Sequence, residues 1–129
     1  MINYFSKYKF IFYLCNLILA ILYLFPGSLF GCFLYNDCTL QPQITKDFIV
    51  STNHLYAFIL LSIIGYLTFN KSPQFVSLTF YLLFLSIILE ILHYIIPNRS
   101  FEIPDIFGNL LGVILVTIIF YLFKKNENV

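Results

Sequence analysis

Residues 88–112 decide the fold of this chain, and they read ILEILHYIIPNRSFEIPDIFGNLLG. Two apolar runs flank a short connection that begins at Pro97 and ends at Pro104. Proline disfavours a helical conformation in the residue before it, and it suits the first turn of a helix. Half of the chain's 6 acidic residues also lie in this window, among otherwise apolar neighbours. The stretch therefore predicts two antiparallel helices joined by a polar turn.

The composition places these helices in lipid. The chain has 129 residues, of which 60% are apolar and only 10% are charged, and its mean hydropathy is +0.91. A soluble domain carries about a quarter charged residues, so this chain cannot cover a surface that faces water. Four apolar stretches approach the ~20 residues that a bilayer span needs, and they cover residues 10–25, 51–69, 75–96 and 106–123. We expect an all-α, four-helix polytopic membrane protein with antiparallel up-down spans, forming a single domain over residues 1–129.

The positive charges predict how the spans are oriented. Most of the 7 Lys and Arg residues flank the spans on one side, at Lys7, Lys9, Lys71, Lys124 and Lys125. The connections on the other side contain only Lys46 and Arg99. Because short basic loops stay in the cytoplasm, we expect a multi-pass protein of the bacterial cytoplasmic membrane with both termini cytoplasmic. The basic residues form no patch, which argues against a nucleic-acid partner.

The first span and the connection after it raise the questions of cleavage and of a disulfide. The segment before Cys32 is similar in pattern to a lipoprotein cleavage site, but Phe30 is bulky where a small residue is needed. We therefore expect the first span to stay uncleaved. Cys32 and Cys38 lie outside the cytoplasm in this topology, where the environment permits a disulfide, and the spacing alone leaves their pairing open. No Cys/His spacing typical of zinc occurs, so we expect neither a metal nor another cofactor.

Six polar residues converge on the outer end of the predicted spans: His54, Glu90, His93, Arg99, Asp105 and Asn109. Glu90 and His93 are three residues apart and share a helix face, and Asp105 and Asn109 share a face of the next helix. A charged group at membrane depth costs at least about 2–3 kcal/mol, so such groups usually face a partner or a cavity. We expect Arg99 to pair with Glu90 or Asp105, or to hold a phosphate or carboxylate in its planar fork. These six residues are the candidate ligand-binding set.

Gly108 and Gly112 form a G-x-x-x-G step at the start of the fourth span. Small residues at this spacing let a second helix approach closely, so we expect this face to pack against a helix. Gly112 shares its face with Asp105 and Asn109, which places the polar residues beside the packing surface.

The polar pattern resembles that of the VanZ-like family of small bacterial membrane proteins. The residues that carry the resemblance are His54, Glu90, Pro97, Arg99, Asp105, Asn109 and Gly112, within residues 54–122. The family usually has glutamine where this chain has His93, so a titratable group replaces a neutral amide. The family is named for a protein linked to resistance to teicoplanin, a glycopeptide antibiotic. The resemblance implies an accessory cell-envelope or antibiotic-resistance role.

Three functions fit these residues. The leading one is an outward-facing pocket that binds a membrane lipid headgroup or a lipid-linked cell-wall precursor, with Arg99 on the phosphate. The alternative is an intramembrane hydrolase or transferase that acts on a lipid-linked substrate, with Glu90 as its general base. In the third, a salt-bridge cluster of Glu90, Arg99 and Asp105 only locks the helical hairpin. The expected partners are membrane lipids and, for the pocket, a lipid-linked cell-wall precursor or a partner protein.

Overall fold

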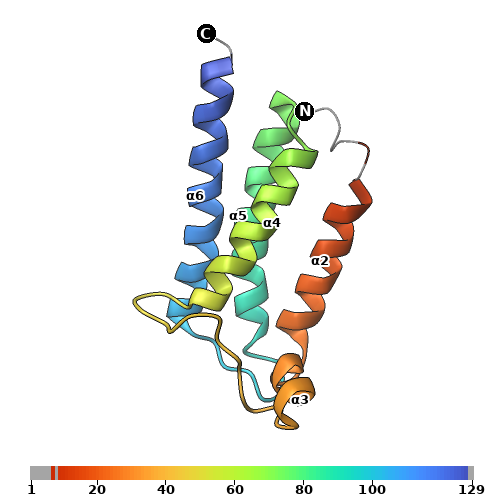
Figure 1. Ribbon diagram of the computed structural model, residues 1–129, viewed down its shortest axis with the longest axis vertical. Coiled ribbons are helices and arrows are strands. Elements are labelled where there is room, and N and C mark those ends of the chain that lie inside the picture. Colours follow the sequence, from red (N-terminus) through yellow and green to blue (C-terminus); the bar gives the residue numbers. More distant parts are fainter. Residues whose placement is uncertain (1–6, 8, 128–129) are drawn as a thin grey trace.

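The computed structural model describes residue 7 and residues 9–127, and this part of the chain is helical with no strand. Its helices are α2 (Lys9–Leu24), α3 (Leu29–Tyr35), α4 (Thr52–Thr68), α5 (Ser72–Leu92) and α6 (Ile103–Glu127). The four long helices stand roughly side by side, with α2 and α6 on opposite sides of α4 and α5 (Figure 1). Short α3 and the two longer connections gather at one end of the bundle (Figure 1). The expected all-α fold is confirmed.

Two helices are long and apolar enough to cross a membrane, namely Pro73–Leu92 and Ile103–Glu127. Together α2 and α3 also pass this test, but they are bent by 78° at the break between them. Helix α4 has 17 residues, which rise about 26 Å at ~1.5 Å per residue, somewhat less than the ~30 Å of a bilayer core. Among the described residues, length and composition therefore support two or three spans, and the expectation of four is confirmed only in part.

The helix ends differ from the expected spans near the polar connection. Helix α5 ends at Leu92, four residues before the expected position. After Leu92 the backbone hydrogen bonds change to the three-residue spacing of a tighter turn. The backbone N–H groups of His93, Tyr94 and Ile95 each donate to a carbonyl three residues earlier. Helix α6 begins at Ile103 and has Pro104 in its first turn, where its missing N–H costs nothing.

Helix α3 was not predicted. Ser28 caps its start, because its Oγ accepts a hydrogen bond from the Gly31 N–H at 3.0 Å. Asn36 ends it in the left-handed conformation at φ 51°. A disulfide joins Cys32 of α3 to Cys38, and the Ser28 N–H donates to the Cys38 carbonyl at 2.7 Å. These bonds hold α3 across the end of the bundle.

Helices α4 and α6 make the most extensive contact in the bundle. A Cβ added to Gly108 would lie 2.6 Å from the Ser51 carbonyl oxygen, and one added to Gly112 would lie 2.8 Å from the Leu55 carbonyl oxygen. The glycine step therefore lets the two backbones approach as small-residue pairs do. The helix that packs on it is α4 of the same chain.

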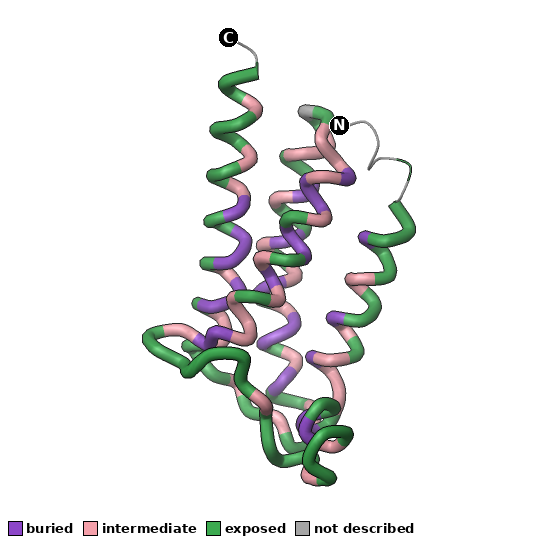
Figure 2. Tube along the Cα trace, viewed as in Figure 1, coloured by how far each residue is buried: buried purple, intermediate pink, exposed green. Residues whose placement is uncertain are grey.

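Burial follows the pattern of a protein whose outer surface faces lipid. Buried residues line the inner faces of the long helices (Figure 2), and Phe58, Leu82 and Val113 are fully buried there. The outer faces are also apolar, with Phe80 and Phe84 exposed on α5 and many similar side chains on α2 and α6. An apolar exterior this large has no role in water.

Basic residues mark the end of the bundle opposite α3. The Lys9 ammonium lies 5.8 Å from the centre of the Phe69 ring, and the Lys124 ammonium donates to the Asn70 carbonyl at 2.9 Å. The start of α2, the turn between α4 and α5 and the end of α6 thus meet at this end (Figure 1). The candidate polar residues lie at the other end.

Candidate functional site

Like Asn109, Glu90 is a fully buried member of the candidate set. It lies in the last turn of α5, and its side chain is 0% exposed. Its Oε1 accepts a hydrogen bond from the backbone N–H of Glu102 at 3.0 Å. Its Oε2 is buried and has no hydrogen-bond partner within the described chain. Burying a polar group without a hydrogen bond is costly, so this oxygen stands out among the buried polar atoms of the site.

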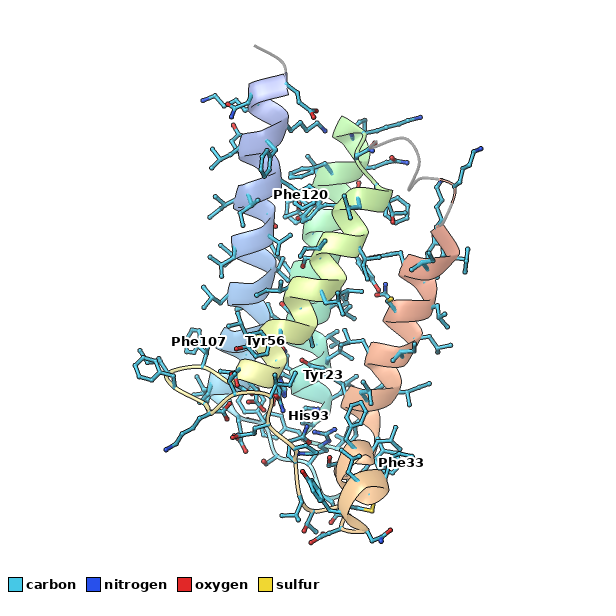
Figure 3. The ribbon with its side chains drawn as sticks, in the orientation of Figure 1. Tyr23, Phe33, Tyr56, His93, Phe107 and Phe120 are labelled. Atoms are coloured by element: carbon cyan, nitrogen blue, oxygen red, sulfur yellow. A yellow bond between two sulfur atoms is a disulfide. The ribbon has the colours of Figure 1, made fainter. Side chains whose placement is uncertain are left out.

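His93 holds Glu90 in place and links α5 to α2. Its Nε2 lies 2.9 Å from the backbone carbonyl oxygen of Tyr23, and because a carbonyl only accepts, Nε2 must carry the hydrogen. Its Nδ1 lies 3.1 Å from Glu90 Oε1, within ion-pair distance but not aligned as a hydrogen bond. Nε2 is therefore hydrogen-bonded, whereas Nδ1 has no hydrogen-bond partner among the described residues. His93 is buried, and Figure 3 shows it beside Tyr23 near the connections.

His54 stands opposite Glu90, in the first turn of α4. Its Nδ1 lies 3.9 Å from Glu90 Oε2, and its Nε2 lies 3.5 Å from Oδ2 of Asp105. Nδ1 has no hydrogen-bond partner among the residues that the structure describes. One atom each from His54, Glu90 and Asp105 can be chosen so that all three lie within 4.8 Å of one another. We name these three residues the carboxylate–imidazole cluster.

Asn109 is bound within the helix bundle. Its Oδ1 accepts a hydrogen bond from the Tyr23 hydroxyl at 2.7 Å, and its Nδ2 donates to the Ser86 carbonyl at 2.9 Å. Asn109 therefore joins α2, α5 and α6. Tyr23 was not in the predicted set. The chain contains 10 tyrosines, and nothing in the sequence distinguishes Tyr23 from the others.

Arg99 does not form the expected ion pair. Its Nε donates to the Phe25 carbonyl at 3.1 Å and its Nη2 to the Leu22 carbonyl at 2.6 Å. No ion pair within 4.0 Å joins it to Glu90 or Asp105 in the described part of the chain. The expectation was wrong because the end of α2 leaves carbonyls without helical partners. Burial lowers the pKa of Arg99, although the charge of Glu90 opposes the shift, and the guanidinium stays protonated.

Two adjoining cavities lie at this end of the bundle. The polar pocket has a volume of about 470 Å³, and its lining includes Asp47, His54, His93, Arg99, Glu102 and Asp105. The apolar groove has a volume of about 530 Å³, and its lining includes Leu19, Leu22, Leu29, Phe30, Ala57 and Leu60. The residues that line both cavities are Ser28, Gln41, Gln43, Asn53, His54 and Arg99. His54 and Arg99 thus stand where the polar pocket meets the apolar groove.

The structure brings all six candidates to one end of the bundle but divides them by role. Arg99, Asn109 and His93 make hydrogen bonds that tie α2 to the rest of the protein. The remaining three candidates form the carboxylate–imidazole cluster, which contains two unpartnered buried atoms. Among the described residues of the set outside the cluster, Nδ1 of His93 is also buried without a hydrogen-bond partner.

No protein-family model matches the chain, and no curated protein or solved structure is detectably similar to it. The resemblance to the VanZ-like family stays a prediction from the residues named above.

Proposed function

We propose that this chain is a four-span protein of the bacterial cytoplasmic membrane that binds one lipid at its outer face. The headgroup of a phospholipid or of a lipid-linked cell-wall precursor occupies the polar pocket, and its hydrocarbon chain occupies the apolar groove. The observation that carries the proposal is the junction of the two cavities at His54 and Arg99. An amphipathic ligand needs a polar and an apolar compartment side by side.

The walls of the groove support entry of a hydrocarbon chain from the side of the bundle. They come mainly from α2, α3, α4 and the connection that precedes α4, and the exposed side chains among them include Phe30, Leu34 and Leu60. Helix α3 turns away from α2 by 78°, so its apolar residues lie across the end of the groove. Exposed apolar residues here favour contact with lipid rather than water.

The distribution of charge and cysteine supports an outward-facing pocket. Lys9, Lys71 and Lys124 belong to the end opposite the pocket, and basic flanks stay in the cytoplasm. The Cys32–Cys38 disulfide belongs to the pocket end, and disulfides persist outside the cytoplasm. If α4 also crosses the membrane, the chain has four spans, and a bilayer accommodates such a slightly short helix by thinning. Because four is an even number of spans, both termini then lie on the cytoplasmic side.

A second candidate function is an intramembrane hydrolase or transferase acting on a lipid-linked substrate. The observation that favours it is the unpartnered Oε2 of Glu90, which can accept a proton from a water or hydroxyl group. Replacing Glu90 with Gln keeps the shape of the side chain and removes the base. Turnover of a lipid-linked substrate at the wild-type rate by this variant would exclude general-base catalysis.

The resemblance to the VanZ-like family adds a physiological proposal, an accessory cell-envelope role that includes glycopeptide resistance. Its test is the growth of a deletion strain in teicoplanin, with and without the gene restored. Equal sensitivity of the two strains would exclude the resistance role.

The lipid-binding proposal can be tested with single tryptophans, because the chain contains none. Ile44 lines the groove and Ile49 does not, yet both lie in the same connection and both are 76% exposed. A phospholipid with brominated acyl chains is titrated into each variant in detergent. We expect the fluorescence of Ile44→Trp to be quenched saturably at about one lipid per chain, and that of Ile49→Trp to show only weak, unsaturated quenching. Equal quenching of both variants would contradict a bound lipid in the groove.

A further inference from the structure

The carboxylate–imidazole cluster has the composition of a metal site. His54 comes from α4, Glu90 from α5 and Asp105 from α6, and their candidate ligand atoms lie within 4.8 Å of one another. Imidazole nitrogen and carboxylate oxygen are the ligands that zinc and similar divalent ions take in proteins. Around a tetrahedral zinc ion, such atoms are about 3.4 Å apart. An ion would have to draw one imidazole nitrogen and the two carboxylate oxygens closer together than the 4.8 Å that now bounds them.

An independent observation shows that something belongs between them. Glu90 is fully buried, and its Oε2 has no hydrogen-bond partner in the described chain although it faces Nδ1 of His54. The two atoms are 3.9 Å apart, which is too long for a direct hydrogen bond. An ion at about 2.0–2.2 Å from each of them would satisfy both.

The surroundings of Glu90 are those of an oriented metal ligand. Its other oxygen, Oε1, accepts from the backbone N–H of Glu102 and lies 3.1 Å from His93. His93 is itself held by the Tyr23 carbonyl. Such outer contacts fix the direction of a ligating carboxylate. Here they hold Oε1, and Oε2 faces Nδ1 of His54.

We propose that His54, Glu90 and Asp105 bind one divalent transition-metal ion of the zinc or manganese class. Two carboxylates and a neutral imidazole supply two negative charges, which the ion neutralises. Three protein ligands leave a coordination position open, as in sites that bind water or substrate. His54 and Asp105 both line the polar pocket, so the open position faces it.

The ion also supplies what the lipid site lacks. The polar pocket contains Asp47, Glu102 and Asp105, with Arg99 as its sole Lys or Arg among the described lining residues. A bare phosphate is repelled by the carboxylates, whereas a bound metal ion attracts it. This link between the ion and a headgroup phosphate rests on the proposed lipid-binding function, but metal binding itself does not.

The test measures metal alone, without lipid. The full-length protein, carrying no polyhistidine tag, is purified in detergent, stripped with a chelator and offered Zn²⁺ or Mn²⁺, and its metal content is measured after desalting. We expect about one ion per wild-type chain, and an affinity lowered by at least about 10- to 100-fold in Glu90→Gln, His54→Gln and Asp105→Asn. Each variant is first checked for wild-type helicity and elution volume.

Glu102→Gln is the matched control. Glu102 lines the same pocket, but within the described part of the chain its side chain bonds only to Ser100, and its bond to Glu90 comes from the backbone. This variant should retain the ion. If Glu90→Gln fails to fold, His54→Gln and Asp105→Asn still test the site. A wild-type chain without a bound ion, or cluster variants that bind as well as Glu102→Gln, would overturn the inference.

The two proposals fail separately. A wild-type protein that binds the ion but shows equal quenching of Ile44→Trp and Ile49→Trp retains the metal site and loses the lipid site. Saturable quenching of Ile44→Trp in a protein that never binds the ion retains the lipid site and loses the metal site.

Discussion

Nδ1 of His54 and Oε2 of Glu90 face one another at 3.9 Å, and neither has a hydrogen-bond partner in the part of the chain described. Buried polar atoms are almost always satisfied in native proteins. Tyr23 and Asn109 beside this pair make hydrogen bonds between helices, whereas Nδ1 of His93 also lacks a hydrogen-bond partner among the described residues. The facing atoms of His54 and Glu90 are the pair that the proposed ion would join.

The contact between α4 and α6 should be sensitive to a single added methyl group. Gly112→Ala places a Cβ 2.8 Å from the backbone oxygen of Leu55, and a backbone cannot move aside without separating the helices. We expect this change to lower the free energy of unfolding in detergent by about 1–3 kcal/mol. Gly65→Ala is the control, because its added Cβ would meet only the flexible side chains of Phe12 and Leu78. Equal loss in both variants would contradict a backbone contact at Gly112.

Removing the Tyr23 hydroxyl should weaken the attachment of α2. Tyr23→Phe leaves the buried Oδ1 of Asn109 without its donor, and an unsatisfied buried acceptor costs about 1–3 kcal/mol. Tyr13→Phe makes the same chemical change on an exposed side chain of α2 and should cost far less. Thermal unfolding of the two variants in one detergent measures the difference. A Tyr23→Phe protein as stable as Tyr13→Phe would show that this bond does not hold α2.

Replacing the guanidinium group of Arg99 should destabilise the protein, even when the positive charge is kept. Arg99→Lys keeps the charge, but one ammonium cannot match the guanidinium that spans the carbonyls of Leu22 and Phe25. Hydrogen bonds from charged groups contribute about 1.5–3 kcal/mol each, so we expect a clear loss of stability in chemical denaturation. Lys46→Arg, in an exposed position of the other connection, is a neutral control. Wild-type stability of Arg99→Lys would leave Arg99 free for a ligand phosphate instead.

The topology can be tested by cysteine labelling in intact cells. Ser100 and Lys71 are both exposed but belong to opposite ends of the bundle. We expect Ser100→Cys to react with a membrane-impermeant thiol reagent from outside, and Lys71→Cys to react only after lysis. The wild-type chain measures the background from Cys15, its free cysteine among the described residues. The reverse labelling pattern would place the polar pocket in the cytoplasm.

The positions of the four long helices and the clustering of the polar residues could be predicted, because both follow from local patterns. Apolar runs ended by Pro97 or by Lys124 mark helices whatever their neighbours are. The polar residues share one end because successive helices alternate in direction, which brings His54, Glu90 and Asp105 together despite their distance in sequence.

The partners of these residues could not be predicted. Arg99 was expected to pair with a carboxylate because the sequence displays charges but not backbone carbonyls, and those at the end of α2 become acceptors only in the folded bundle. The proposed metal site was not expected either, because its three residues lie on separate helices and follow no short motif. Helix α3 was not predicted because it has only seven residues, too few to show a helical pattern. Ser28 before it is a typical N-cap residue and could have indicated a helix start.

Native mass spectrometry of the protein released gently from its own membrane tests the lipid site most directly. Leu60 lines the groove and Leu17 does not, yet their side chains are 60% and 58% exposed, so Leu60→Trp and Leu17→Trp form a matched pair. We expect about one lipid to remain on each wild-type and Leu17→Trp chain, and to be lost from Leu60→Trp. Loss from neither variant, or a wild-type chain that carries no lipid at all, would contradict binding in the groove.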